Sequence, residues 1–77
     1  MSTLDNLLLK NRDETDYEFE LRRRLSIYLY EKNFLKNLKN KEPYIIMYSN
    51  MIINHLYKNV IYPKKYQNVI DEIIRQI

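Results

Sequence analysis

The sequence of 77 residues contains no cysteine, no glycine and no tryptophan. The absence of cysteine excludes disulfide scaffolds, iron–sulfur centres and zinc sites built from thiolates. Without glycine, the chain has no phosphate-binding loop of the P-loop or Rossmann kind. No apolar run approaches the ~20 residues that cross a bilayer, and no N-terminal stretch is typical of a signal peptide. We therefore expect a protein of the cytosol or nucleus with no membrane partner.

Length and composition favour one small domain. Hydrophobic residues make up 45% of the chain and charged residues 30%, with a formal net charge of +3. A chain of this size buries only ~60% of its unfolded surface, so it is marginally stable alone and often needs a partner. Isoleucine, lysine, asparagine and tyrosine, whose codons are AT-rich, supply 35 residues. This bias is typical of an AT-rich genome, such as that of a parasite, a protist, a virus or a phage.

The spacing of apolar residues predicts a single all-α domain over residues 1–77, with an open arrangement of short helices. Thr15 and Glu18 have the spacing of a capping box. Asn33 is the expected turn, because asparagine tolerates the left-handed backbone best when no glycine is present. Pro43 and Pro63 suit the first position of the helices that follow them. The five predicted helices lie near residues 3–10, 16–32, 34–40, 43–58 and 63–77.

The segment 44–57 is apolar on nearly every side. A β-strand is the competing interpretation of residues 44–48, but apolar residues continue at helical spacing through Leu56 with no turn signal. A helix that is apolar all round must be covered on all sides. Either its own neighbours cover it as a central helix, or another chain covers part of it, with Tyr48 and Met51 as candidates. The last predicted helix has the clearest apolar stripe, formed by Tyr66, Val69, Ile70, Ile73, Ile74 and Ile77.

The sequence shows no arrangement of residues typical of catalysis or metal binding. His55 is the only histidine, and no cluster of histidine and acidic residues has metal-ligand spacing. Ser26 and Ser49 have no adjacent base. The acids of residues 13–20 are typical of helix capping and solvated charge. We therefore expect no enzyme activity, no metal site and no cofactor.

Residues 22–24 are three consecutive arginines. On a helix such residues fan over ~200°, so they cannot all face one partner. One interpretation is a solvated helix edge that pairs with Glu18 and Glu20. The other is a surface that contacts nucleic acid or an acidic protein. The residues of that surface would be Arg22, Arg23, Arg24, Lys36 and Lys39, with Lys32 beside them.

Residues 29–39 resemble the Enhancer of yellow / Sus family, a group of small all-helical factors in transcription and mRNA export. The matching residues are Leu29, Glu31, Leu38 and Lys39, with Phe34 at an aromatic position and Asn33 in place of the family's glycine. The residues similar to the last helix of the family are Pro63, Tyr66, Ile70 and Ile74. The resemblance extends over roughly residues 17–77. It implies a non-enzymatic adaptor of the nucleus that clasps a long helix of a scaffold protein.

Such a scaffold would belong to the histone-deubiquitinating module of a transcription coactivator, to an mRNA-export complex, or to both. Phe34 is expected to be buried where two helices meet. The residues expected to contact the partner are Leu25, Tyr28, Leu29, Phe34, Leu38, Tyr48, Met51, Ile52, Ile70 and Ile74.

Two alternatives remain open. The chain has the charge of a small basic nucleic-acid-binding protein of an AT-rich virus or phage, which would act in the host cytoplasm. Leu25, Tyr28 and Leu29, followed by Asn33 and Phe34, also look like a LisH motif, which would imply a homodimer.

Overall fold

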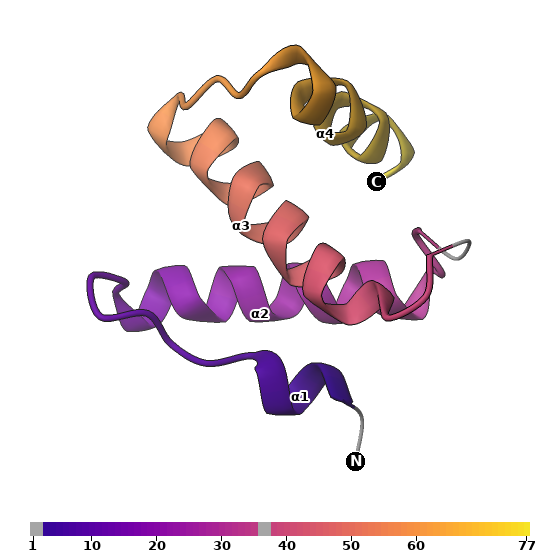
Figure 1. The fold of residues 1–77 in the computed structure, drawn as a ribbon. Coiled ribbons are helices and arrows are strands. Elements are labelled where there is room, and N and C mark those ends of the chain that lie inside the picture. Colours follow the sequence, from indigo (N-terminus) through magenta and orange to yellow (C-terminus); the bar gives the residue numbers. More distant parts are fainter. Residues whose placement is uncertain (1–2, 36–37) are drawn as a thin grey trace.

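The computed structural model describes residues 3–35 and 38–77. These residues form four α-helices and no strand: α1 (Thr3–Leu7), α2 (Asp16–Glu31), α3 (Lys41–Lys58) and α4 (Lys64–Gln76) (Figure 1). The predicted all-α class is confirmed, and residues 44–48 are helical, which excludes the strand alternative. Across the described ranges, no helix combines the length and the apolar character needed to cross a bilayer.

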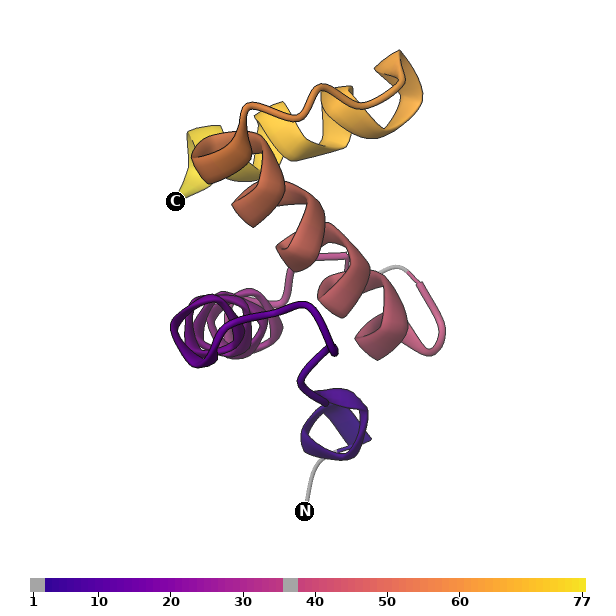
Figure 2. The same cartoon turned by 90° about the vertical axis from the view of Figure 1, so that its left-hand side faces the viewer.

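The central helix is α3, which packs against each of the other three helices. Figure 2 shows α1 at one end of the molecule and α4 at the other, with α2 and α3 crossing between them. A single hydrophobic core runs through this arrangement. Its buried members are Leu4, Leu8, Leu29, Ile45, Tyr48, Ile52, Ile70 and Ile73.

The capping box at the start of α2 is confirmed. The Glu18 amide donates to the Thr15 hydroxyl at 3.1 Å, and the Thr15 amide donates to the Glu18 carboxylate at 3.0 Å. The two bonds satisfy amides that have no partner inside the helix. The expected turn at Asn33 is confirmed as well, because its φ is 59°. Both features depend on neighbouring residues only.

The helix predicted over residues 34–40 is not formed among the residues that the structure describes. Residues 32–35 and 39–40 are turns, and residues 36 and 37 lie outside the described ranges. Asn33, Leu35 and Asn40 have φ values of 59°, 60° and 52°. A right-handed helix cannot include residues in this left-handed region, so the prediction was wrong. We call the described residues between the two helices, 32–35 and 38–40, the α2–α3 turn.

Some helix boundaries also differ from the prediction. The first helix ends at Leu7, three residues earlier than expected. Helix α3 begins at Lys41, so Pro43 is its third residue and not its first. Proline is tolerated there because the amides of the first turn have no helical acceptor. Pro63 precedes α4 with a ψ of 148°, and the helix begins at Lys64.

Candidate partner-binding cleft

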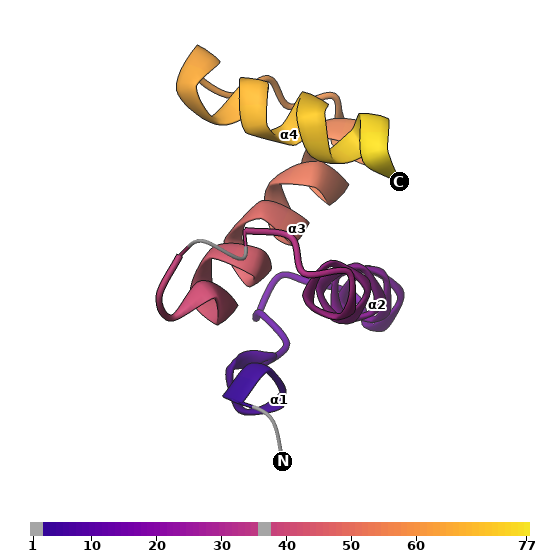
Figure 3. The ribbon, with the colours of Figure 1, turned by 90° about the vertical axis from the view of Figure 1, so that its right-hand side faces the viewer.

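A cleft of about 850 Å³ lies between the α2–α3 turn, the first half of α3 and the part of α4 from Asn68 onward. Figure 3 shows the turn and α4 on the same side of α3. Most of the lining side chains are apolar or aromatic. These are Phe34, Leu35 and Leu38 from the turn, Tyr44 and Tyr48 from α3, and Val69 and Ile73 from α4. We call this feature the cleft.

The floor of the cleft is part of the protein's own core, and its edges are exposed. Tyr48 and Ile73 are buried, whereas Tyr44 is 46% exposed and Leu38 is 44% exposed. Burial is the main cause that raises the pKa of Tyr48 above its ordinary value of 10.0, with a smaller effect of Tyr66 and Tyr44. The hydroxyl of Tyr48 therefore stays neutral at physiological pH. The cleft thus offers an uncharged aromatic floor.

One edge of the cleft is basic. Lys32 lines the cleft, and its ammonium group lies 5.8 Å from the centre of the Tyr28 ring. The ammonium group of Lys41 lies 4.8 Å from the centre of the Tyr30 ring and donates to the side-chain oxygen of Asn33 at 3.1 Å. Contacts between a cation and an aromatic face contribute about 0.5–1 kcal/mol at exposed sites. Lys32 therefore lies at the cleft itself, and Lys41 is bonded to the lining residue Asn33.

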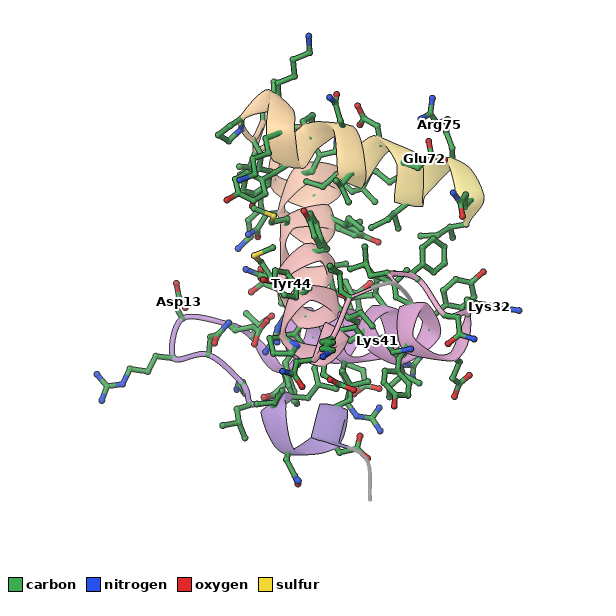
Figure 4. The ribbon with its side chains drawn as sticks, turned by 45° about the vertical axis from the view of Figure 1, so that its right-hand side comes forward. Asp13, Lys32, Lys41, Tyr44, Glu72 and Arg75 are labelled. Carbon is green, nitrogen blue, oxygen red and sulfur yellow. The ribbon has the colours of Figure 1, made fainter. Side chains whose placement is uncertain are left out.

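The opposite edge, on α4, carries a charge that is already paired. Figure 4 shows Glu72 and Arg75 on α4, across the opening from Lys32. The Glu72 carboxylate accepts a hydrogen bond from the Gln76 amide at 2.9 Å and also pairs with Arg75. The bond from Gln76 and the charge of Arg75 hold the pKa of Glu72 below its ordinary value of 4.5. Glu72 is therefore ionised, and Arg75 balances its charge at the wall of the cleft.

The apolar stripe of α4 is only partly covered. Ile70 and Ile73 are buried against α3, while Ile77 remains 57% exposed. Val69 and Ile74 are half-buried. The same holds for α3, because Tyr44, Leu56 and Tyr57 are 46%, 55% and 62% exposed. The described residues therefore do not seal either helix.

The cleft brings together three of the ten residues predicted to contact a partner: Phe34, Leu38 and Tyr48. Three others, Leu29, Ile52 and Ile70, are at most 1% exposed, so they stabilise the core and present no accessible surface. The remaining four, Leu25, Tyr28, Met51 and Ile74, are half-buried or exposed and do not line the cleft.

Sequence reasoning missed four of the apolar lining residues: Leu35, Tyr44, Val69 and Ile73. Val69 and Ile73 belong to the predicted apolar stripe of α4. The spacing of a stripe shows which residues share a helix face, but not which of them meet the core. For Tyr44, the sequence predicted only that it belongs to the apolar segment 44–57, not that it lines a cleft.

The three arginines of residues 22–24 do not form one basic surface. Arg22 is 3% exposed, and its guanidinium is bonded inside the protein, so it is not available to a partner. Arg23 and Arg24 are exposed and both pair with Glu20, as in the solvated-edge interpretation. Glu18 pairs instead with Lys58. Lys39 is exposed, and Lys36 lies outside the described residues.

No group with metal-ligand geometry occurs within the described part of the chain. His55 Nδ1 lies 2.8 Å from the carbonyl oxygen of Val60, which ties the end of α3 to the segment before α4. The Ser26 hydroxyl donates to the carbonyl oxygen of Arg22 at 2.8 Å. His55 and Ser26 thus make local structural contacts, whereas the Ser49 hydroxyl has no hydrogen-bond partner among the described residues.

No family model, no curated protein and no solved structure matches this chain. The resemblance of residues 29–39 to the Enhancer of yellow / Sus family therefore stays a prediction. Function is inferred from the residues that line the cleft and from its geometry.

Proposed function

We propose that this protein is a non-enzymatic helical adaptor whose cleft receives an amphipathic helix of another protein. The observation that carries the proposal is the apolar cleft of about 850 Å³ beside the partly covered face of α4. Contiguous apolar surface that stays exposed on a small domain marks an interaction site. Laying the apolar face of a helix into such a groove is a common form of peptide recognition.

The cleft suits a helix better than an extended peptide. One common way to bind an extended segment is to add it to the unpaired edge of a sheet, and the described residues contain no strand. A helix satisfies its own backbone hydrogen bonds. The 13 residues of α4 span ~20 Å, so a partner helix of about the same length would lie along it. Its apolar residues would cover Tyr44 and Val69.

The family resemblance extends this proposal to a cellular setting. The partner would be a scaffold protein of a nuclear transcription coactivator with a histone-deubiquitinating module, or of an mRNA-export complex.

The two alternative functions, nucleic-acid binding and LisH-like dimerisation, have less support. Arg22, one of the arginines of the nucleic-acid interpretation, is bonded inside the protein and does not reach a nucleic acid. The LisH-like interpretation needs Leu29 at a dimer interface, and Leu29 is 1% exposed.

The test uses two variants on the same helix. Tyr44→Asp places a charge in the cleft, and Tyr57→Asp places the same charge at an exposed position of α3 that does not line it. Both should keep their helix content and melting temperature by circular dichroism. We expect the wild type and Tyr57→Asp to retain the same partner protein in affinity purification from the native source, and Tyr44→Asp to lose it.

Retention of that partner by Tyr44→Asp at the wild-type level would overturn the cleft as the binding site. Mass spectrometry then tests the cellular setting, because a coactivator or export scaffold is the expected partner. A dimer mass in sedimentation, with no other protein retained, would favour the homodimer alternative.

A further inference from the structure

The α2–α3 turn concentrates positive charge at the opening of the cleft. The described residues 32–35 and 38–41 contain three lysines and no acid. Lys32 lines the cleft directly, Lys39 follows the lining residue Leu38, and Lys41 is bonded to the lining residue Asn33. Glu31 and Glu42 flank this run at its two ends. Net charge along this edge is therefore positive.

These lysines differ from most basic side chains of the protein in their contacts. Lys32 and Lys41 lie over tyrosine rings, and among the described residues neither they nor Lys39 forms an ion pair. By contrast, Arg75 across the opening is paired with Glu72. The unneutralised charge that faces an incoming helix thus comes from the α2–α3 turn and from Lys41, the first residue of α3.

We propose that the helix received by the cleft is acidic, with carboxylates on its polar face that meet Lys32, Lys39 and Lys41. This inference rests on the proposed function and names the chemistry of the partner. Complementary charge at the edge of an interface raises the association rate and fixes the orientation of the partner, while the apolar floor supplies contact area. The tyrosine rings hold Lys32 and Lys41 in place, which lowers the entropy lost on binding.

The experiment uses two fluorescent peptides of about 18 residues with the same leucine stripe. One carries glutamate at its polar positions and the other carries lysine. Fluorescence anisotropy with the full chain at ~50 mM salt should show binding of the glutamate peptide about tenfold tighter than that of the lysine peptide. The preference should shrink at ~500 mM salt, because salt screens exposed charges beyond a few ångströms.

Two double variants with the same net charge show which lysines cause the preference for the glutamate peptide. The double variant Lys32→Glu with Lys39→Glu should remove the preference for the glutamate peptide. The double variant Lys64→Glu with Lys65→Glu changes the net charge by the same amount at the start of α4, where neither residue lines the cleft. It should keep a preference of about the wild-type size. Equal effects of the two variants would overturn the proposed contact with the turn.

The remaining outcomes separate this inference from the proposed function. Equal binding of both peptides, abolished by Tyr44→Asp, would overturn the acidic partner and leave the adaptor. Binding of neither peptide, or binding that Tyr44→Asp leaves unchanged, would overturn both. A single-stranded DNA of about 20 nucleotides serves as a third probe. Tighter binding of this DNA than of the glutamate peptide, lost with Lys32→Glu and Lys39→Glu, would assign the turn to nucleic acid instead.

Discussion

The guanidinium of Arg22 donates two hydrogen bonds to the carboxylate of Glu14, from Nε at 2.8 Å and from Nη2 at 3.0 Å. Nη2 also donates to the carbonyl oxygen of Leu9 at 2.5 Å, and the ring of Phe19 lies 5.4 Å away. Both side chains of the pair are at least nine-tenths buried. This pair fastens the segment between α1 and α2 to the side of α2.

Removal of one partner of this pair should be costly. Glu14→Ala leaves the charge of Arg22 buried without a counter-ion, and we expect a loss of about 3 kcal/mol in the free energy of unfolding. Urea unfolding followed by circular dichroism measures this loss. Glu20→Ala is the matched control, because its partners Arg23 and Arg24 are exposed and exposed pairs contribute little. A loss below about 1 kcal/mol for Glu14→Ala would contradict the assignment.

Stability should fall in acid partly because of Glu18. Its carboxylate accepts from the Thr15 amide and pairs with Lys58, and these contacts lower its pKa from 4.5 to about 2. A carboxyl whose pKa is lowered in the folded state stabilises the fold above its unfolded pKa. That contribution should disappear as the pH falls from about 4.5 to about 2.

Urea midpoints measured between pH 5 and pH 2 test this dependence. The slope against pH should be smaller in Glu18→Gln than in the wild type. Part of the slope should remain, because the hydrogen bond from Arg22 also lowers the pKa of Glu14. Identical slopes in the two proteins would show that the Glu18 contacts do not persist in solution.

Ser49 has a buried hydroxyl with no hydrogen-bond partner among the described residues, and its side chain is fully buried. A buried polar group without a partner costs about 1–3 kcal/mol. Ser49→Ala should therefore raise the free energy of unfolding by about 1 kcal/mol. Ser26→Ala is the control, because the equally buried Ser26 hydroxyl does donate a hydrogen bond. Its stability should rise less, and a Ser49→Ala protein that unfolds more easily than the wild type would refute the expectation.

The variant Phe34→Ala tests whether this side chain contributes mainly to binding or to the stability of the fold. Complete burial at a helix junction would predict a loss of about 3–5 kcal/mol for Phe34→Ala. The side chain is only half-buried and lines the cleft, so about 1–2 kcal/mol is expected. Leu29→Ala, at a position 1% exposed, should cost about 2–5 kcal/mol.

Phe34→Ala should also weaken binding of the glutamate peptide at a temperature where the variant is fully folded. Chemical unfolding gives the two stability values, and anisotropy gives the affinity. A large loss of stability together with unchanged affinity would place Phe34 in the core and outside the binding surface.

The features that the sequence predicted correctly are local ones. The helices predicted over residues 16–32, 43–58 and 63–77 correspond to α2, α3 and α4, with ends that differ by one or two residues. They follow from apolar spacing within one or two turns. The capping box of Thr15 and Glu18 needs residues only three positions apart. The turn at Asn33 follows from the backbone preference of one side chain. The helix predicted over residues 34–40 failed because local spacing was read across residues whose backbone is left-handed.

By itself, the sequence determined the all-α class, the positions of three helices and the apolar stripe of α4. Tertiary structure alone decided that Arg22 pairs with Glu14, eight positions away, and that its guanidinium is buried. It also decided that Tyr44, Phe34 and Val69 meet around one cleft. The physical reason is that helix formation depends on neighbours within a turn. The angle at which α4 packs on α3, and therefore the surface left open, depends on the burial free energy of the whole core.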